Sequence, residues 1–158
     1  ERFRVRDYIF TNAAHAAYVE VDRDTGFIKV LNYWLVEDCG RVINPQLVAE
    51  QQRGSVVHGL GDALYEHCIY DDAGQLQNAT MADYIVPMSA EMPDIVVEHV
   101  VTPTSKTTLG AKGAGESGMA GVPQTILSAV NDAIAPSGGR VAAVPVTPED
   151  VLHALGRL

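Results

Sequence analysis

The chain has 158 residues, of which 47% are hydrophobic, and it carries a formal net charge of −9 at pH 7. That apolar content is enough for a folded core and excludes a disordered chain. The acidic balance disfavours nucleic acid as a partner. No apolar run approaches the roughly 18 residues of a membrane-spanning helix, so we expect no membrane span. We predict a single domain over residues 1–158, complete or as a piece of a larger protein.

Cysteine and histidine usage excludes the common metal and cluster sites. Cys39 and Cys68 are far apart and form no Cys-x-x-Cys pair, so they cannot by themselves assemble a zinc site or an iron–sulfur cluster. The five histidines show no metal-ligand spacing, and no metal ligand is assigned. We expect free thiols in a cytoplasmic protein, with one structural disulfide as the alternative. The N-terminus does not resemble a signal peptide and lacks an initiator Met, which indicates a processed or truncated product.

The first half of the chain predicts a hairpin followed by a long helix. Alternating apolar and polar residues over 13–22 are typical of a half-buried strand. A β-branched and aromatic run over 27–36 predicts its partner, after a turn at 24–26. Helical spacing then extends over 46–65. Gly54, Gly59 and Gly61 each cost such a helix about 1 kcal/mol relative to alanine, so each needs a reason. That reason is close approach of another helix, or of a ligand beside Gln51.

The second half predicts one more strand and two helices. Residues 95–101 are a β-branched run, and residues 123–135 have helical spacing with Pro123 in the first turn. Thr147 is placed to cap a short final helix that begins at Pro148. Because strands and helices mix without a βαβ alternation, the predicted fold class is α+β, with a mixed or antiparallel sheet and packed helices.

The loop over residues 109–118 holds one cation and one carboxylate among glycines and small residues. Glycines admit backbone conformations closed to other residues and leave room for a bound group. The loop lies just before a predicted helix, whose unpaired N–H groups favour a nearby anion. In one interpretation the backbone binds an anionic ligand, Lys112 adds positive charge and Glu116 accepts a proton. In the other, the loop is a tight surface turn in which both side chains are solvated.

Five short blocks follow one another along the chain. They are Asp-Cys-Gly-Arg-Val-Ile-Asn-Pro at 38–45, Gln51-x-x-Gly54-x-x-x-His58-Gly59-Leu60-Gly61-x-Ala63-Leu64, Asp83-Tyr84-x-x-Pro87, the glycine-rich loop at 110–118, and Pro145-x-Thr147-Pro148-Glu149. In this order they resemble the C-terminal end of the molybdenum-binding subunit of the xanthine dehydrogenase, aldehyde oxidase and carbon monoxide dehydrogenase family. The resemblance covers roughly residues 13–152. It implies the fold of the second molybdenum-cofactor-binding domain, as a fragment or a split subunit.

The resemblance also implies roles for single residues. Glu116 matches the family's active-site glutamate, the general base that takes a proton from a molybdenum-bound hydroxyl as that oxygen attacks an electrophilic carbon. Gln51 matches a glutamine that hydrogen-bonds the pterin cofactor, and Lys112 matches a lysine near that cofactor. The small residues that admit the metal end of the cofactor are matched by Gly113, Ala114 and Gly115.

Cofactors and partners are implied in the same way. The resemblance implies a molybdenum–molybdopterin cofactor, favours its cytosine dinucleotide form, and places Fe-S clusters and FAD on partner domains. The expected partners are the remainder of the molybdopterin-binding subunit, iron–sulfur and flavin subunits, and a small-molecule substrate. We therefore expect part of a molybdenum-dependent hydroxylase or dehydrogenase that oxidises an aldehyde or aromatic heterocycle with a water-derived oxygen and is inactive alone. The alternatives are a non-catalytic scaffold or assembly homologue of that domain, and an unrelated soluble ligand-binding domain.

Overall fold

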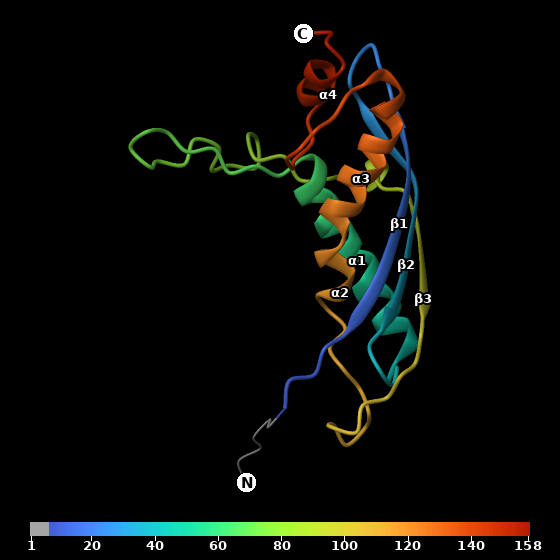
Figure 1. Cartoon of the computed structure of the whole chain (residues 1–158). Helices are drawn as coiled ribbons and strands as arrows, with labels where there is room; N and C mark the ends of the chain where they lie inside the picture. Colours follow the sequence, from blue (N-terminus) through green and yellow to red (C-terminus); the bar gives the residue numbers. More distant parts are fainter. Residues whose placement is uncertain (1–6) are drawn as a thin grey trace.

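The computed structural model describes residues 7–158, and its elements follow the predicted order (Figure 1). The elements are β1 (Asn12–Val21), β2 (Ile28–Asp38), α1 (Pro45–Leu64), η1 (Ser89–Glu91), β3 (Asp94–His99), α2 (Ser117–Ala120), α3 (Val122–Ile134), η2 (Ala135–Ser137) and α4 (Pro148–Ala154). The predicted hairpin, long helix, third strand and two C-terminal helices are confirmed. Helix α2 and the 3-10 helices η1 and η2 were not predicted, because three or four residues are too few to show a period.

The sheet has three strands in the order β1-β2-β3. Strands β1 and β2 form an antiparallel hairpin in which Ala16 lies opposite Trp34. Strand β3 pairs with β2 in parallel, so that Val96 lies opposite Trp34 on the other side. The chain runs through α1 between β2 and β3, because parallel neighbours need a crossover connection. The predicted α+β class with a mixed sheet is therefore confirmed, and it includes one β-α-β crossover that the sequence pattern did not reveal.

Helices α1 and α3 cover one face of the sheet, and the core lies between these layers (Figure 1). Tyr33 and Leu35 of β2 are fully buried, because alternate strand residues face the same side. The fully buried helix residues that meet this face include Val56 and Leu60 of α1 and Ile126 and Val130 of α3. The apolar residues of the predicted helix over 46–65 are not all buried, because Leu47 in the first turn of α1 is 67% exposed.

Hydrogen-bonded caps define where α1 and α4 begin. The side chain of Asn44 accepts a hydrogen bond from the Leu47 amide at the start of α1, directly after the loop that leaves β2. Thr147 and Asp150 form the predicted capping box of α4. Within residues 7–158, none of the helices is long and apolar enough to cross a membrane. Both cysteines are free thiols, as expected.

Candidate functional site

The glycine-rich loop is fixed to the chain that leaves β2. The Arg41 amide donates to the Gly110 carbonyl at 3.0 Å, and the Lys112 amide donates to the Cys39 carbonyl at 2.7 Å. Gly40 and Gly110 both have positive φ, at 69° and 75°. A Cβ on Gly40 would lie 2.4 Å from the Gly110 carbonyl oxygen. Backbone conformation and close approach therefore both require glycine at this junction.

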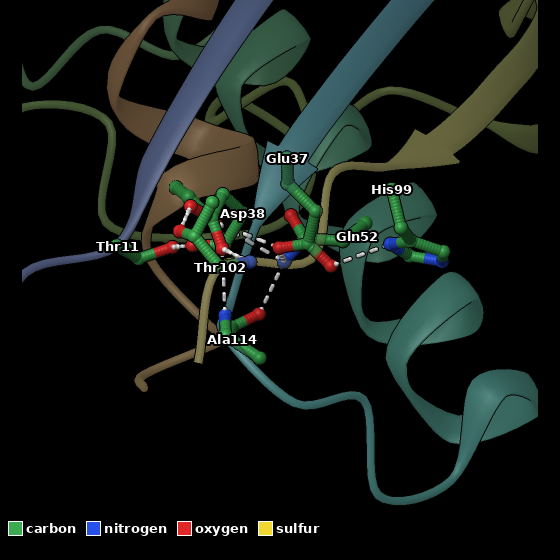
Figure 2. A network of polar contacts seen from close by, with 9 residues as sticks. Thr11, Glu37, Asp38, Gln52, His99, Thr102 and Ala114 are labelled. Atoms are coloured by element: carbon green, nitrogen blue, oxygen red, sulfur yellow. Dashed lines mark hydrogen bonds and ion pairs between the residues drawn. The ribbon is translucent and has the colours of Figure 1, made fainter. Parts of the chain in front are cut away.

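Lys112 is paired with a carboxylate and is not solvated, contrary to the surface-turn interpretation. Its Nζ lies 2.9 Å from Asp38 Oδ2, and the two side chains are only 11% and 13% exposed. Lys112 Nζ also donates to the Thr102 hydroxyl at 2.9 Å, and that hydroxyl donates to Asp38 (Figure 2). Burial raises the pKa of Asp38, but hydrogen bonds from Thr102, Lys112 and the Gly40 amide outweigh it and hold the pKa well below its usual value. Lys112 thus joins the loop to the end of β2.

The Asp38→Asn substitution should make the unfolding free energy less dependent on pH in acid. The folded-state pKa of Asp38 lies below its ordinary value of 3.8, so its ionised form contributes stability that is present above that pH and is lost as pH falls. We expect the unfolding free energy of the wild-type chain to fall more steeply than that of the variant between about pH 4 and pH 2. Urea unfolding across this range measures both slopes. Asp132→Asn, an exposed site on α3, is the control; equal slopes for wild type and Asp38→Asn would contradict the pairing.

Glu116 lies at the end of the loop, directly before α2, and is exposed. Together with His15 and Ser117 it lines a hollow of about 410 Å³ between β1 and α2. His15 Nε2 lies 2.9 Å from the Ser117 carbonyl, which can only accept, so this nitrogen carries the proton. His15 Nδ1 then accepts from the Tyr33 hydroxyl at 2.9 Å. Desolvation lowers the pKa of His15 despite the bond to Ser117, so a neutral imidazole shares the hollow with the Glu116 carboxylate.

A buried polar network that was not predicted from the sequence connects Gln52 with Glu37 and with Ala114 of the loop (Figure 2). Gln52 of α1 is fully buried, and its Nε2 donates to Glu37 Oε2 and to the Ala114 carbonyl. The Ser117 hydroxyl donates to the same Glu37 oxygen at 3.1 Å. His99 Nδ1 lies 3.2 Å from Glu37 Oε1, an ion-pair distance without hydrogen-bond alignment. Burial raises the pKa of Glu37, and Ser117 and His99 only partly oppose it.

Three glycines on the outer side of the site meet nothing within the described chain. A Cβ on Gly54, Gly113 or Gly115 would find no atom within 4 Å, and none of the three has positive φ. Neither backbone conformation nor packing among residues 7–158 therefore requires glycine at these positions. Helix α1 and the loop therefore present an open backbone surface at these three exposed positions.

The structure brings most of the predicted site residues to this surface. The Ser55 hydroxyl lies 2.8 Å from the Gln51 carbonyl and 2.7 Å from the Gly115 carbonyl, which places α1 directly against the loop. Gln51 is exposed. Lys112 lies on the other side of the loop, against Asp38. Sequence reasoning missed Gln52, which occupies an unspecified position of the second block, and His15, which lies outside the five blocks.

The chain matches a family model and several proteins of known function. Residues 4–93 match the family model described as the molybdopterin cofactor-binding domain. The chain is 44% identical over 146 residues to the nicotine 6-hydroxylase large subunit of Paenarthrobacter nicotinovorans, which covers 92% of this chain and 18% of that protein. It is 33% identical over 132 residues to the carbon monoxide dehydrogenase large chain of Hydrogenophaga pseudoflava, which covers 84% of this chain and 16% of that protein.

A solved structure shows the same fold. Quinoline 2-oxidoreductase from Pseudomonas putida 86 superposes with a TM-score of 0.91 at 40% sequence identity, over 96% of this chain and 19% of that one. The chain thus spans less than a fifth of the length of these relatives. The family match extends over more than half of the sequence, and the fold agrees with it. This chain belongs to the molybdopterin cofactor-binding domain family of molybdenum-binding large subunits.

Proposed function

We propose that this chain forms part of a molybdenum-dependent hydroxylase or dehydrogenase that oxidises an aldehyde or aromatic heterocycle with a water-derived oxygen. The observation that carries the proposal is the open surface of Gly54, Gly113 and Gly115 beside the exposed Glu116. Nicotine and quinoline, which occur in the names of two relatives, are both nitrogen heterocycles and favour the heterocycle over the aldehyde. Free cysteines suit the reducing cytoplasm, where we place the complex.

In this proposal some residues of the chain bind the cofactor and one transfers a proton. The molybdenum–molybdopterin group, in its cytosine dinucleotide form, would supply a redox-active Lewis acid when bound. The Gln51 amide would hydrogen-bond the pterin, while the backbone at 113–115 allows the metal end to approach. Lys112, held by Asp38, would lie near the cofactor and supports the loop. Glu116 accepts the proton that the reaction releases.

The rest of the enzyme would come from other parts of the complex. Since this chain spans 18% of the nicotine 6-hydroxylase large subunit, most of the substrate pocket lies on the remainder of the molybdopterin-binding subunit. Iron–sulfur and flavin subunits carry the electrons away from the metal. The chain alone is therefore inactive.

Gln51→Ala should weaken cofactor retention in the native complex. Loss of one or two buried hydrogen bonds costs about 1–3 kcal/mol, which weakens binding roughly 5- to 150-fold. Elemental mass spectrometry of the complex gives the molybdenum-to-protein ratio. Gln46→Ala, an exposed glutamine in the first turn of the same helix, is the control.

The two possible failures of this experiment differ. Stoichiometric metal in the Gln51→Ala complex would refute the role of Gln51 only. A wild-type chain that purifies from its own cells without metal or larger subunits would instead favour the scaffold alternative.

A further inference from the structure

The backbone on both sides of Glu116 is tied to one buried side chain. Gln52 Nε2 donates to the carbonyl of Ala114, two residues before Glu116, and lies 3.2 Å from the hydroxyl of Ser117, the next residue. Glu116 itself is exposed between these two contacts. We propose that Gln52, held by Glu37, is a positioning residue that fixes the direction in which Glu116 points. This inference rests on the general-base role of Glu116 proposed above.

The hydrogen-bond donors fix the orientation of the Gln52 amide. Its two N–H groups are surrounded by three oxygens, from Glu37, Ala114 and Ser117. The Ser117 hydroxyl itself donates to Glu37, so it needs no proton from Gln52. The two N–H groups therefore go to Glu37 and Ala114. A flipped amide would aim its oxygen at the Glu37 carboxylate, so Glu37 holds Gln52 in the orientation that holds Ala114.

Close packing keeps the segment after Glu116 in the same place. A Cβ on Gly118 would lie 2.2 Å from Gln52 Oε1 and 2.8 Å from the Cβ of Ser55, so the start of α2 rests directly on α1. Among the described residues, Gln52 Oε1 has no hydrogen-bond partner, and this contact with Gly118 is what it faces. His15 Nε2 donates to the Ser117 carbonyl from the opposite side.

Gly115 explains why the segment before Glu116 needs these contacts from Gln52 and Ser55, which we call the clamp. Gly115 is exposed, and a Cβ there would meet no atom within 4 Å, so no side-chain packing holds this residue next to Glu116. The Ser55 hydroxyl at 2.7 Å and the Gln52 contact to Ala114 are the hydrogen bonds that restrain it. Because these bonds are buried or half-buried, they are stronger than the same bonds in water. Loss of the Gln52 amide would leave Glu116 at the end of a freely turning segment.

The test is Gln52→Leu in the assembled enzyme, which keeps the side-chain bulk and removes the two N–H donors. We expect kcat to fall on the order of 10- to 100-fold, with KM and molybdenum occupancy unchanged. Amide hydrogen exchange of a peptide over 113–118 should become faster, which reports the clamp independently of turnover. Gln124→Leu, an exposed glutamine on α3, is the matched control.

Two variants of Glu37 test whether a hydrogen-bond acceptor at this position is enough to hold Gln52. Glu37→Gln retains an oxygen that can accept from Gln52 and should keep most of the activity, whereas Glu37→Leu should behave like Gln52→Leu. If Gln52→Leu does not fold, Ser117→Ala removes a single hydroxyl from the network and should change exchange and kcat in the same direction, by less. Wild-type kcat in Gln52→Leu overturns the positioning role, and wild-type hydrogen exchange over 113–118 in this variant likewise overturns it, because Gln52 then does not hold the segment.

Comparison of Glu116→Gln with Gln52→Leu distinguishes failure of the general-base role from failure of the positioning role. Normal turnover of Glu116→Gln overturns the general base, and hydrogen exchange over 113–118 then still decides whether Gln52 holds the segment. Slow turnover of Glu116→Gln with normal turnover of Gln52→Leu leaves the base intact and removes only the positioning role.

Discussion

Replacement of Glu116 by Gln in the assembled enzyme should abolish measurable turnover while leaving molybdenum content nearly intact. Glutamine has the same size but cannot accept the proton, and a general base contributes roughly 10²- to 10⁴-fold to the rate. The fold should not suffer, because the hydrogen bonds at this residue come from its carbonyl, which accepts from the Met119 and Ala120 amides at 3.1 Å. Steady-state rates and elemental mass spectrometry on the same preparation separate loss of chemistry from loss of cofactor.

Glu149→Gln is the matched control for Glu116→Gln, since it removes another exposed carboxylate, from α4. It should leave both rate and metal content at wild-type values. Turnover of the Glu116 variant at the control rate would refute the general-base role. Loss of molybdenum together with activity would show instead that Glu116 supports the cofactor and not the chemistry.

The two charged residues of the glycine-rich loop have opposite environments, and neither sequence interpretation describes both. Lys112 is mostly buried and neutralised by Asp38, whereas Glu116 is exposed. The sequence could not show this, because Asp38 is 74 positions away from Lys112 and the parallel pairing of β2 with β3 brings the two residues together. The arrangement leaves a negative charge as the free charge at the end of the loop, as a proton acceptor requires.

The helices and strands were predictable because their periodicity is local. The network around Gln52 was not, although one signal was present: Glu37 continues the inward alternation of Tyr33 and Leu35 on β2, so a carboxylate falls where only buried residues belong. Such a position needs a polar partner. Gln51 and Gln52 look equivalent in sequence, but neighbouring helix residues differ in direction by about 100°, so one is exposed and the other fully buried. Which of them faces inward depends on packing and not on the motif.

The glycines of α1 should give opposite results in the isolated chain. Gly59→Val should lower the free energy of unfolding by about 3 kcal/mol, at the upper end for overpacking. An added Cβ would lie 2.5 Å from the Cβ of Val122 and 3.0 Å from the Met119 carbonyl oxygen, so α1 and α3 would have to separate. Gly54→Ala should raise the free energy by up to about 1 kcal/mol, because the new methyl group meets no atom of this chain within 4 Å and alanine favours the helix. Urea unfolding of both variants measures the difference, and a destabilised Gly54→Ala chain would contradict it.

In the assembled enzyme the effect of Gly54→Ala should reverse. Gly54 costs helix stability, and no contact within residues 7–158 requires a glycine there. Its presence is explained if the rest of the enzyme lies against it. The methyl group would then occupy space needed by the cofactor or by a neighbouring segment, so molybdenum content should fall although the chain itself is more stable. A variant that is both more stable alone and fully loaded in the complex would show that the surface around Gly54 stays open, and the cofactor would have to approach the loop from the side of Gly113 and Gly115.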